Sequence, residues 1–401
     1  MDSFANFLRN SEAIPFATVS AQRRDGSHII SQNVDRNIFQ TSAKKPIGNQ
    51  TVYALASLTK LPTTVAALQL VEKGVIALDD DVSNIIPALG RQKVLSGWND
   101  DGTPILTPRR RPLTLRHLLT HCAGISYDFN DEQLQRYHRH RGSKPSHGAT
   151  VDERFDVPLL TEPGESGWVY GGGLDWVGKI VENLSGLSLE EYFKRHLWRS
   201  LGVQSFTFWP QSLKGTGHDL AAMVARSRRT GKLRQLPVVG LPFNQGAEDC
   251  FGGQGAFCSS NDFMKLLHAL LVNDGTLLRR ETVDMMFEGQ LPQGSRHALE
   301  ASMKEPTWTL GKYNPEEVYN WGLGGLLINT ASNTAGSIKQ EEATMTWGGA
   351  ANQFWFIDRK KGICGLFMTQ VLPQGDPDIR KLIEEFHMLV NRAFNEPKSR
   401  L

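Results

Sequence analysis

Residues 51–78 constrain the fold most, because a short apolar stretch there continues directly into an amphipathic helical pattern. Its apolar residues recur at steps of three or four, the spacing of one helix face; they are Leu58, Leu61, Val65, Leu68 and Val71. Gly74 follows as a natural C-terminal cap. Pro62 would remove a backbone hydrogen bond beyond the first turn, so the sequence predicts a kinked or tightened first turn just after Ser57.

The start of this helix carries the S-x-x-K sequence Ser57-Leu-Thr-Lys60. Residues three apart lie on one helix face, so the Lys60 amine can reach the Ser57 hydroxyl, where the helix dipole favours negative charge. A serine hydroxyl needs an adjacent base, and a desolvated lysine can supply one because burial disfavours its charged form. A second S-x-x-K, Ser42-Ala-Lys-Lys45, stands in a polar stretch without helical pattern, so Ser57 is the candidate nucleophile.

Composition limits the classes of protein to which the chain can belong. Its 401 residues allow about two or three structural lobes around a large core. Because 44 Lys and Arg oppose 42 Asp and Glu, no global field attracts nucleic acid, and we expect no nucleic-acid partner. No apolar run approaches the roughly 18 residues of a membrane helix, so we also expect no membrane span.

The cysteines and the two ends of the chain bear on its cellular location. Four widely spread cysteines without a C-x-x-C pair favour reduced, buried thiols, and the N-terminus has no signal-peptide pattern. We therefore predict a cytoplasmic protein. The last residues, Ser399-Arg400-Leu401, are a conservative variant of the S-K-L peroxisomal signal, so a peroxisomal location is the alternative.

Helical patterns dominate the middle of the chain and strand patterns its last third. We expect helices at residues 114–121, 174–184, 188–201 and 376–394, and loops at residues 91–112 and 136–148. Short β-branched or aromatic runs predict strands at residues 321–329, 343–347, 353–357 and 363–368. The predicted fold class is α/β. Residues 1–80 and 240–401 form an α/β lobe with a central sheet, residues 81–239 form a mainly helical lobe, and the active site lies between them.

Metal and nucleotide motifs are absent from the sequence. There is no G-x-S-x-G, H-E-x-x-H, Walker A or G-x-G-x-x-G sequence. His117 and His121 are four apart on a predicted helix and could share a metal ion, but no third ligand is evident. We therefore expect neither a metal nor another cofactor.

Five segments point to a known family. They are Ser57-Leu-Thr-Lys60, Leu115-Arg-His-Leu-Leu-Thr-His-Cys-Ala-Gly-Ile125, Tyr170-Gly-Gly-Gly-Leu-Asp-Trp-Val-Gly178, Gly252-Gly-Gln-Gly-Ala-Phe-Cys-Ser-Ser-Asn-Asp262 and Trp347-Gly-Gly349. In this order, over roughly residues 52–368, the chain resembles the serine β-lactamase and penicillin-binding-protein superfamily, in its class C and esterase-like branch. The resemblance implies a β-lactamase/transpeptidase-like fold, in which an antiparallel sheet flanked by helices adjoins a mostly helical lobe.

The resemblance also implies roles for individual residues. Ser57 matches the nucleophile and Lys60 its partner base. Tyr170 matches the tyrosine that opens the family's Y-x-N motif, a general base and acid beside Ser57; a nearby ammonium would favour its phenolate. The triplet Trp347, Gly348 and Gly349 takes the place of K-T-G and lines the site. By position, the amides of Ser57 and Ala350 form the oxyanion hole. Tyr127 is a candidate for the pocket rim, with a packing role as the alternative.

Two departures from the family pattern bear on the substrate. Trp347 replaces the lysine that attracts the carboxylate of a β-lactam, and Gly172 replaces the asparagine of Y-x-N. Both changes make the pocket wall more apolar, so we expect neither β-lactamase nor peptidase activity. An indole suits an apolar acyl chain or a polycyclic alcohol better than an ionic group.

Within the superfamily, the chain is most similar to the fungal acyltransferases of lovastatin type. This similarity implies a serine acyltransferase with an acyl-Ser57 intermediate. Its partners would be an acyl thioester, on an acyl carrier protein or coenzyme A, and an alcohol of a secondary metabolite. A carboxylesterase or thioesterase-type hydrolase with the same residues is the alternative. A third possibility is a non-catalytic binding protein of the same fold. The presence of all three candidate catalytic residues, Ser57, Lys60 and Tyr170, argues against it.

Overall fold

The computed structural model describes residues 8–39, 46–146, 148–165, 167–304, 314–330 and 343–395. The second S-x-x-K sequence at residues 42–45 lies outside the described residues, as does the C-terminal Ser399-Arg400-Leu401. The peroxisomal signal therefore stays a prediction.

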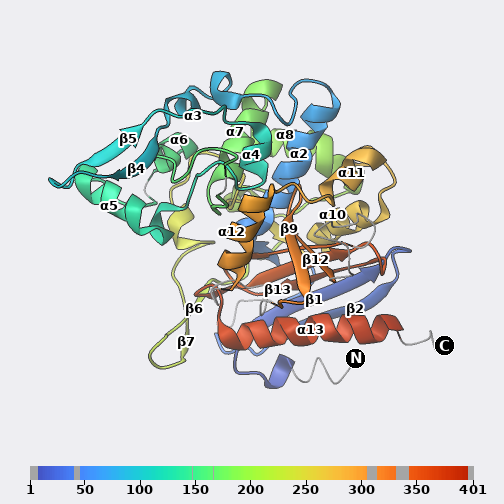
Figure 1. The fold of residues 1–401 in the computed structure, drawn as a ribbon. Helices are drawn as coiled ribbons and strands as arrows, with labels where there is room; N and C mark the ends of the chain where they lie inside the picture. Colours follow the sequence, from blue (N-terminus) through green and yellow to red (C-terminus); the bar gives the residue numbers. More distant parts are fainter. Residues whose placement is uncertain are drawn as a thin grey trace, which may run out of the picture.

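A seven-stranded antiparallel sheet forms the centre of the molecule (Figure 1). In spatial order its strands are β2 His28–Asp35, β1 Phe16–Arg23, β13 Ile363–Met368, β12 Gln353–Asp358, β11 Thr344–Gly349, β10 Leu326–Thr330 and β9 Glu317–Trp321. Strand β1 pairs with β13, with Thr18 opposite Met368 and Arg23 opposite Ile363. The two ends of the chain therefore share one sheet, as the sequence predicts.

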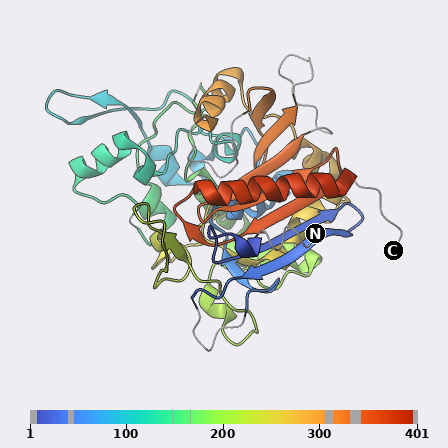
Figure 2. The ribbon, with the colours of Figure 1, turned by 90° about the horizontal axis from the view of Figure 1, so that it is seen from below.

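Helices cover both faces of this sheet. Helix α10 (Ser260–Val272) contacts β1, β12 and β13, and α13 (Pro377–Asn395) lies across the opposite face against β2 and β13 (Figure 2). Every residue of β12 and β13 is buried, as expected for strands covered on two sides. Two further helices, α11 (Arg280–Met286) and α12 (Gln293–Met303), precede β9.

The predicted strand at residues 321–329 is wrong as a single element. It contains the end of β9, a turn, and β10, which pairs antiparallel with β9. The turn closes with a hydrogen bond from the Gly322 amide to the Gly325 carbonyl at 2.9 Å, and Gly324 has a φ of +123°. A side chain strains the backbone in that region, so the glycines allow the reversal.

The segment around Ser57 follows the sequence prediction closely. Strand β3 (Val52–Ala54) pairs with β8 (Phe257–Ser259) and leads into a 3₁₀ turn, η1 (Ala56–Thr59). Helix α2 (Lys60–Glu72) follows, and Gly74 lies just beyond it with a φ of +67°. The tightened first turn predicted from Pro62 is therefore confirmed as a 3₁₀ turn.

Short helices fill the middle of the chain. They are α3 Pro87–Arg91, α4 Leu115–Leu119, α5 Glu132–Arg141, α6 Val151–Phe155, α7 Gly173–Ser185, α8 Leu189–Phe193 and α9 Arg199–Leu201, with 3₁₀ turns η2 Val82–Asn84, η3 Asp128–Asn130, η5 Pro210–Leu213 and η6 Pro242–Asn244. The helices predicted at residues 174–184 and 188–201 are confirmed. The second is divided by a π-helical segment, η4 (Lys194–Trp198).

The loop predicted at residues 91–112 is wrong in part, because it contains a β-hairpin. Strands β4 (Val94–Trp98) and β5 (Pro104–Thr107) pair antiparallel, and the Asn99 amide donates to the Thr103 carbonyl at 2.9 Å to close the connection. The Leu95 amide donates to the Leu159 carbonyl, which attaches β4 to a segment far along the chain. This long-range contact stabilises strands that the polar local sequence does not indicate.

The loop predicted at residues 136–148 is also wrong in part, because α5 extends to Arg141. The Asp131 side chain accepts from the Leu134 amide at 2.9 Å and caps the first turn. Gly142 ends the helix in the left-handed conformation. The side chains of α5 are mostly polar and show little apolar periodicity, so the sequence pattern did not predict this helix.

Two smaller features complete the fold. Strand β14 (Val371–Leu372) pairs with β6 (Val224–Arg226), which pairs with β7 (Leu233–Gln235). One large cluster of buried apolar side chains includes residues of α2, α4, α7, α10, α13 and the central sheet. None of the helices in the described residues is both long and apolar enough to cross a membrane.

Candidate active site

Ser57 lies in a strained turn between β3 and α2. The preceding residue, Ala56, is buried and has a φ of +49°, a left-handed conformation that residues with a Cβ rarely adopt. Such strain persists only where the surrounding structure imposes it, and it is common at functional sites. Ser57 itself is half-buried.

Lys60 is buried, with only 3% of the residue exposed, and its ammonium group is fully hydrogen-bonded. Its Nζ donates to Ser57 Oγ at 3.2 Å, to the hydroxyl of Tyr127 at 2.9 Å and to the carbonyl of Gly253 at 2.7 Å. Three acceptors match the three donors of an ammonium group. The amine is therefore held in one position, against the Ser57 hydroxyl.

Tyr170 approaches Ser57 from the other side. Its hydroxyl donates to Ser57 Oγ at 2.8 Å, and Lys60 Nζ lies 4.8 Å from the centre of its ring. The indole Nε1 of Trp347 donates to the same Tyr170 oxygen at 2.9 Å. The structure thus brings the three residues expected to be catalytic, Ser57, Lys60 and Tyr170, into one hydrogen-bonded group.

Tyr127 lies deeper than the rim position expected for it. It is 5% exposed, packs edge-to-face on the Tyr170 ring at 5.7 Å, and accepts the Lys60 hydrogen bond. Burial raises its pKa well above the usual value of a tyrosine. Tyr127 is therefore a neutral phenol that orients the Lys60 amine.

Sequence reasoning missed Asp175, in the first turn of α7. Its carboxylate is completely buried, and one oxygen accepts a hydrogen bond from the Gly253 amide at 2.8 Å. Burial raises the pKa of Asp175 to about 6, while the positive charge of Lys60 opposes that rise. Asp175 thus orders the Gly253 segment whose carbonyl holds Lys60. The available signal was an acidic residue among apolar neighbours, five positions after Tyr170.

The two histidines considered as metal ligands have other surroundings. His117 Nδ1 accepts from the Thr114 amide in the capping box of α4. His121 is 2% exposed, and its ring packs on Tyr170 at 4.6 Å and on Trp321 at 5.0 Å between ring centres. Burial holds the pKa of His121 well below its usual value, so its ring is neutral.

The end of β11 lies beside the serine, since β11 contacts η1. A Cβ added to Gly349 would lie 2.9 Å from the Leu55 carbonyl oxygen, so only glycine fits this close approach. Trp347 is 3% exposed, with its N–H directed at Tyr170, and Gly348 precedes Gly349 in the same strand. Ala350 follows in the turn after β11.

Packing explains why a glycine occupies position 172. A Cβ added there would lie 2.7 Å from the ring of Phe155, in α6. The aromatic ring occupies the space that a longer side chain at this position would need. The absence of the family's asparagine is therefore matched by a bulky apolar neighbour.

The fold and the cluster define a class: a serine enzyme in which lysine and tyrosine converge on the hydroxyl beside an antiparallel sheet. A family model described as Beta-lactamase matches residues 26–387, and the chain belongs to this family. It is 37% identical to a lovastatin esterase of Penicillium rubens, over 94% of both chains. It is 35% identical to a monacolin J acid methylbutanoyltransferase of Aspergillus terreus, over 88% of this chain and 84% of that protein.

Solved structures give the same result for the fold. The chain superimposes on unliganded simvastatin synthase (LovD) from Aspergillus terreus with a TM-score of 0.86 and 31% identity. The match covers 99% of this chain and 98% of the other. The antiparallel sheet with flanking helices expected from the sequence is therefore confirmed.

Proposed function

We propose that the protein is a serine acyltransferase that moves an acyl group from a thioester to an alcohol through an acyl-Ser57 intermediate. One observation carries this proposal. Ser57 Oγ lies 2.8 Å from the Tyr170 hydroxyl and 3.2 Å from Lys60 Nζ, so the nucleophile contacts both the tyrosine whose phenolate can accept its proton and the ammonium that favours this phenolate. Distances in this range permit direct proton transfer.

In the first half-reaction, Tyr170 reacts as the phenolate, after losing its proton to solvent, and the Lys60 ammonium favours this charge. Ser57 Oγ then attacks the thioester carbonyl and passes its proton to the Tyr170 oxygen. The oxyanion of the tetrahedral intermediate accepts hydrogen bonds from the Ser57 and Ala350 amides. Each such donor is typically worth about 3–4 kcal/mol of barrier. Collapse breaks the carbon–sulfur bond, and the thiolate takes the proton from Tyr170. The Trp347 N–H is aimed at the Tyr170 oxygen that would carry negative charge in this step.

In the second half-reaction, the acceptor hydroxyl attacks the acyl-Ser57 ester. Tyr170 takes the proton of the alcohol and returns a proton to Ser57 Oγ as the ester bond breaks. The donor would be an acyl group on an acyl carrier protein or coenzyme A. The acceptor would be an alcohol of a secondary metabolite, as the name of the methylbutanoyltransferase relative suggests.

A hydrolase is the second candidate, favoured by the 37% identity to the lovastatin esterase. Water would then replace the alcohol in the second half-reaction, with the same residues. The acyl-enzyme half is common to both activities. They differ in the lifetime of acyl-Ser57 in water.

The proposal is tested by time-resolved intact mass of the protein mixed with a short acyl thioester. We expect one acyl adduct on the wild type that persists in water and disappears when an alcohol is added. Ser57→Ala should show no adduct, whereas Ser96→Ala, which removes an exposed hydroxyl in β4, should label normally. Lys60→Ala and Tyr170→Phe should slow adduct formation by about 10²- to 10⁴-fold, the usual contribution of an acid–base group.

The other outcomes decide between the alternatives. Free acid released without an accumulating adduct, in the presence of a good alcohol, would indicate the hydrolase. An adduct of unchanged yield on Ser57→Ala would contradict both mechanisms.

A further inference from the structure

The turn that joins β11 to β12 (residues 349–352) carries the Ala350 amide. The Asn352 amide donates to the Gly349 carbonyl at 2.9 Å, which closes the turn, and the Val371 amide donates to the Ala351 carbonyl at 3.2 Å. Among the described residues, none accepts a hydrogen bond from the Ala350 amide, so this amide is free to donate to a ligand. Its direction depends on the conformation of this turn.

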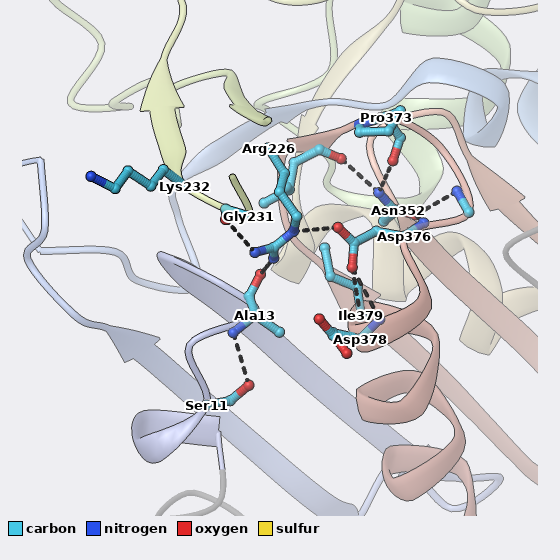
Figure 3. Close-up of polar contacts among 12 residues, drawn as sticks. Ser11, Ala13, Arg226, Gly231, Lys232, Asn352, Pro373, Asp376, Asp378 and Ile379 are labelled. Carbon is cyan, nitrogen blue, oxygen red and sulfur yellow. Dashed lines mark hydrogen bonds and ion pairs between the residues drawn. The ribbon is translucent and has the colours of Figure 1, made fainter. Parts of the chain in front are cut away.

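Asn352 fixes that conformation. It is completely buried and has a φ of +62°, a left-handed conformation that asparagine tolerates better than most residues. Its side-chain Nδ2 donates to the carbonyls of Val371 at 2.7 Å and Pro373 at 2.8 Å. Its Oδ1 accepts from the amides of Gly375 at 2.9 Å and Asp376 at 3.3 Å. The amide group therefore uses both donors and both acceptor positions (Figure 3).

The segment that Asn352 holds, residues 371–376, is itself fixed by further contacts. Asp376 is 3% exposed and caps α13 by accepting from the amides of Asp378 and Ile379, each at 3.1 Å. Arg226, in β6, forms an ion pair with the Asp376 carboxylate and donates to the carbonyl of Ala13 (Figure 3). The turn is thus attached, through one side chain, to the N-terminus of a 19-residue helix.

We propose that Asn352 is a positioning residue that fixes the turn so that the Ala350 amide points at the oxyanion. The inference rests on the proposed function, because it takes the Ala350 amide as an oxyanion donor. Oxyanion donors act at about 2.7–3.1 Å and lose their effect when displaced, so a small rotation of this turn matters. No smaller side chain can make the four hydrogen bonds, and aspartate would present an acceptor to the Val371 and Pro373 carbonyls.

The test compares Asn352→Gly with Asn352→Asp in the full-length protein, using the acyl thioester. Asn352→Gly permits the left-handed backbone but removes the four bonds. We expect both variants to slow acylation of Ser57 by about 10- to 100-fold with KM within threefold, because one donor of the oxyanion hole is displaced. Affinity for phenylboronic acid, which forms a tetrahedral adduct on a serine, should fall by a similar factor.

One control variant separates positioning from stability. Asn273 also has a left-handed φ, +56°, and caps α10 away from the serine, so Asn273→Gly should lower Tm without changing the acylation rate. Folded Asn352 variants that acylate at the wild-type rate would overturn the inference and leave the proposed function intact. A wild type that forms no Ser57 adduct would instead remove the proposed function, and the inference with it.

Discussion

At the scale of single residues, the site is an arrangement of buried charge. Lys60 lies among acceptors, and Asp175 supplies a carboxylate whose field reaches the ammonium without direct contact. The second oxygen of Asp175 has no hydrogen-bond partner among the described residues. A buried carboxylate without full hydrogen bonding is costly to ionise, so its charge is retained at the expense of stability.

Asp175→Asn should therefore change how stability depends on pH. Burial raises the Asp175 pKa from 3.8 to about 6, so the folded protein binds this proton more tightly than the unfolded chain does. The resulting stability is present below the ordinary pKa and is lost as pH rises through about 6. Relative to wild type, the variant should gain roughly 2 kcal/mol in free energy of unfolding between about pH 4.5 and pH 7.5, measured by urea unfolding.

Asp79 offers a control of opposite sign. A hydrogen bond from Arg116 holds the pKa of Asp79 below its usual value. Asp79→Asn should lose stability relative to wild type as pH rises, by a small amount because the carboxylate is exposed. An Asp175→Asn variant whose difference from wild type stays constant with pH would show that Asp175 titrates normally.

At the scale of elements, α7 is set against the site by three consecutive glycines. Cβ atoms on Gly171, Gly172 and Gly173 would meet the Ile125 carbonyl, the Phe155 ring and the Leu118 carbonyl, respectively, at 2.2, 2.7 and 2.8 Å. The absence of side chains lets the start of α7 approach α4 and α6 closely. Tyr170 lies three residues before the first residue of this helix, so the packing of α7 determines where its ring lies.

Gly172→Asn, which restores the family's Y-x-N, should therefore destabilise the protein. Overpacking against Phe155 typically costs about 1–3 kcal/mol, measured as a fall in Tm. In the double variant with Phe155→Ala, the loss of stability should be smaller than the sum of the losses in the two single variants. Gly186→Asn at the other end of α7, where a Cβ has open space and φ is +69°, should cost much less. Equal losses at Gly172 and Gly186 would contradict the packing explanation.

At the scale of the whole molecule, one apolar cluster is continuous through the regions predicted as two lobes. It includes Leu61 and Leu68 of α2, Trp176 of α7, and Trp355 of the central sheet. The division into residues 1–80 and 240–401 on one side and residues 81–239 on the other stays a prediction. Strand β6, inside the predicted helical lobe, pairs with β14 near the C-terminal end of the chain.

A continuous core predicts a single unfolding transition, even though chains of this size often populate intermediates. Far-UV circular dichroism and tryptophan fluorescence should give coincident urea curves, and calorimetry should give one peak. Ser57→Ala serves as an inactive reference whose curves should also coincide. Two separated transitions would show that the lobes unfold independently.

The sequence predicts what local spacing determines. Residues 57 and 60 meet because a helical turn places them on one face, and the helix after Ser57, its tightened first turn and its cap all follow from neighbouring residues. The helix α5 and the hairpin of β4 and β5 were not predicted, because the apolar pattern of both segments is weak. The caps stabilise α5, and long-range contacts stabilise the hairpin.

Only the tertiary structure decided the rest of the site. Tyr127 and Gly253 reach Lys60 across separations of 67 and 193 residues, and Tyr170 reaches Ser57 across 113. The resemblance to a family suggested Tyr170, but no local pattern identified Tyr127 as the acceptor for Lys60, or Asp175 and Asn352 as the side chains that hold distant backbone groups in place. Such contacts depend on how distant segments pack together. Local periodicity carries no information about that packing.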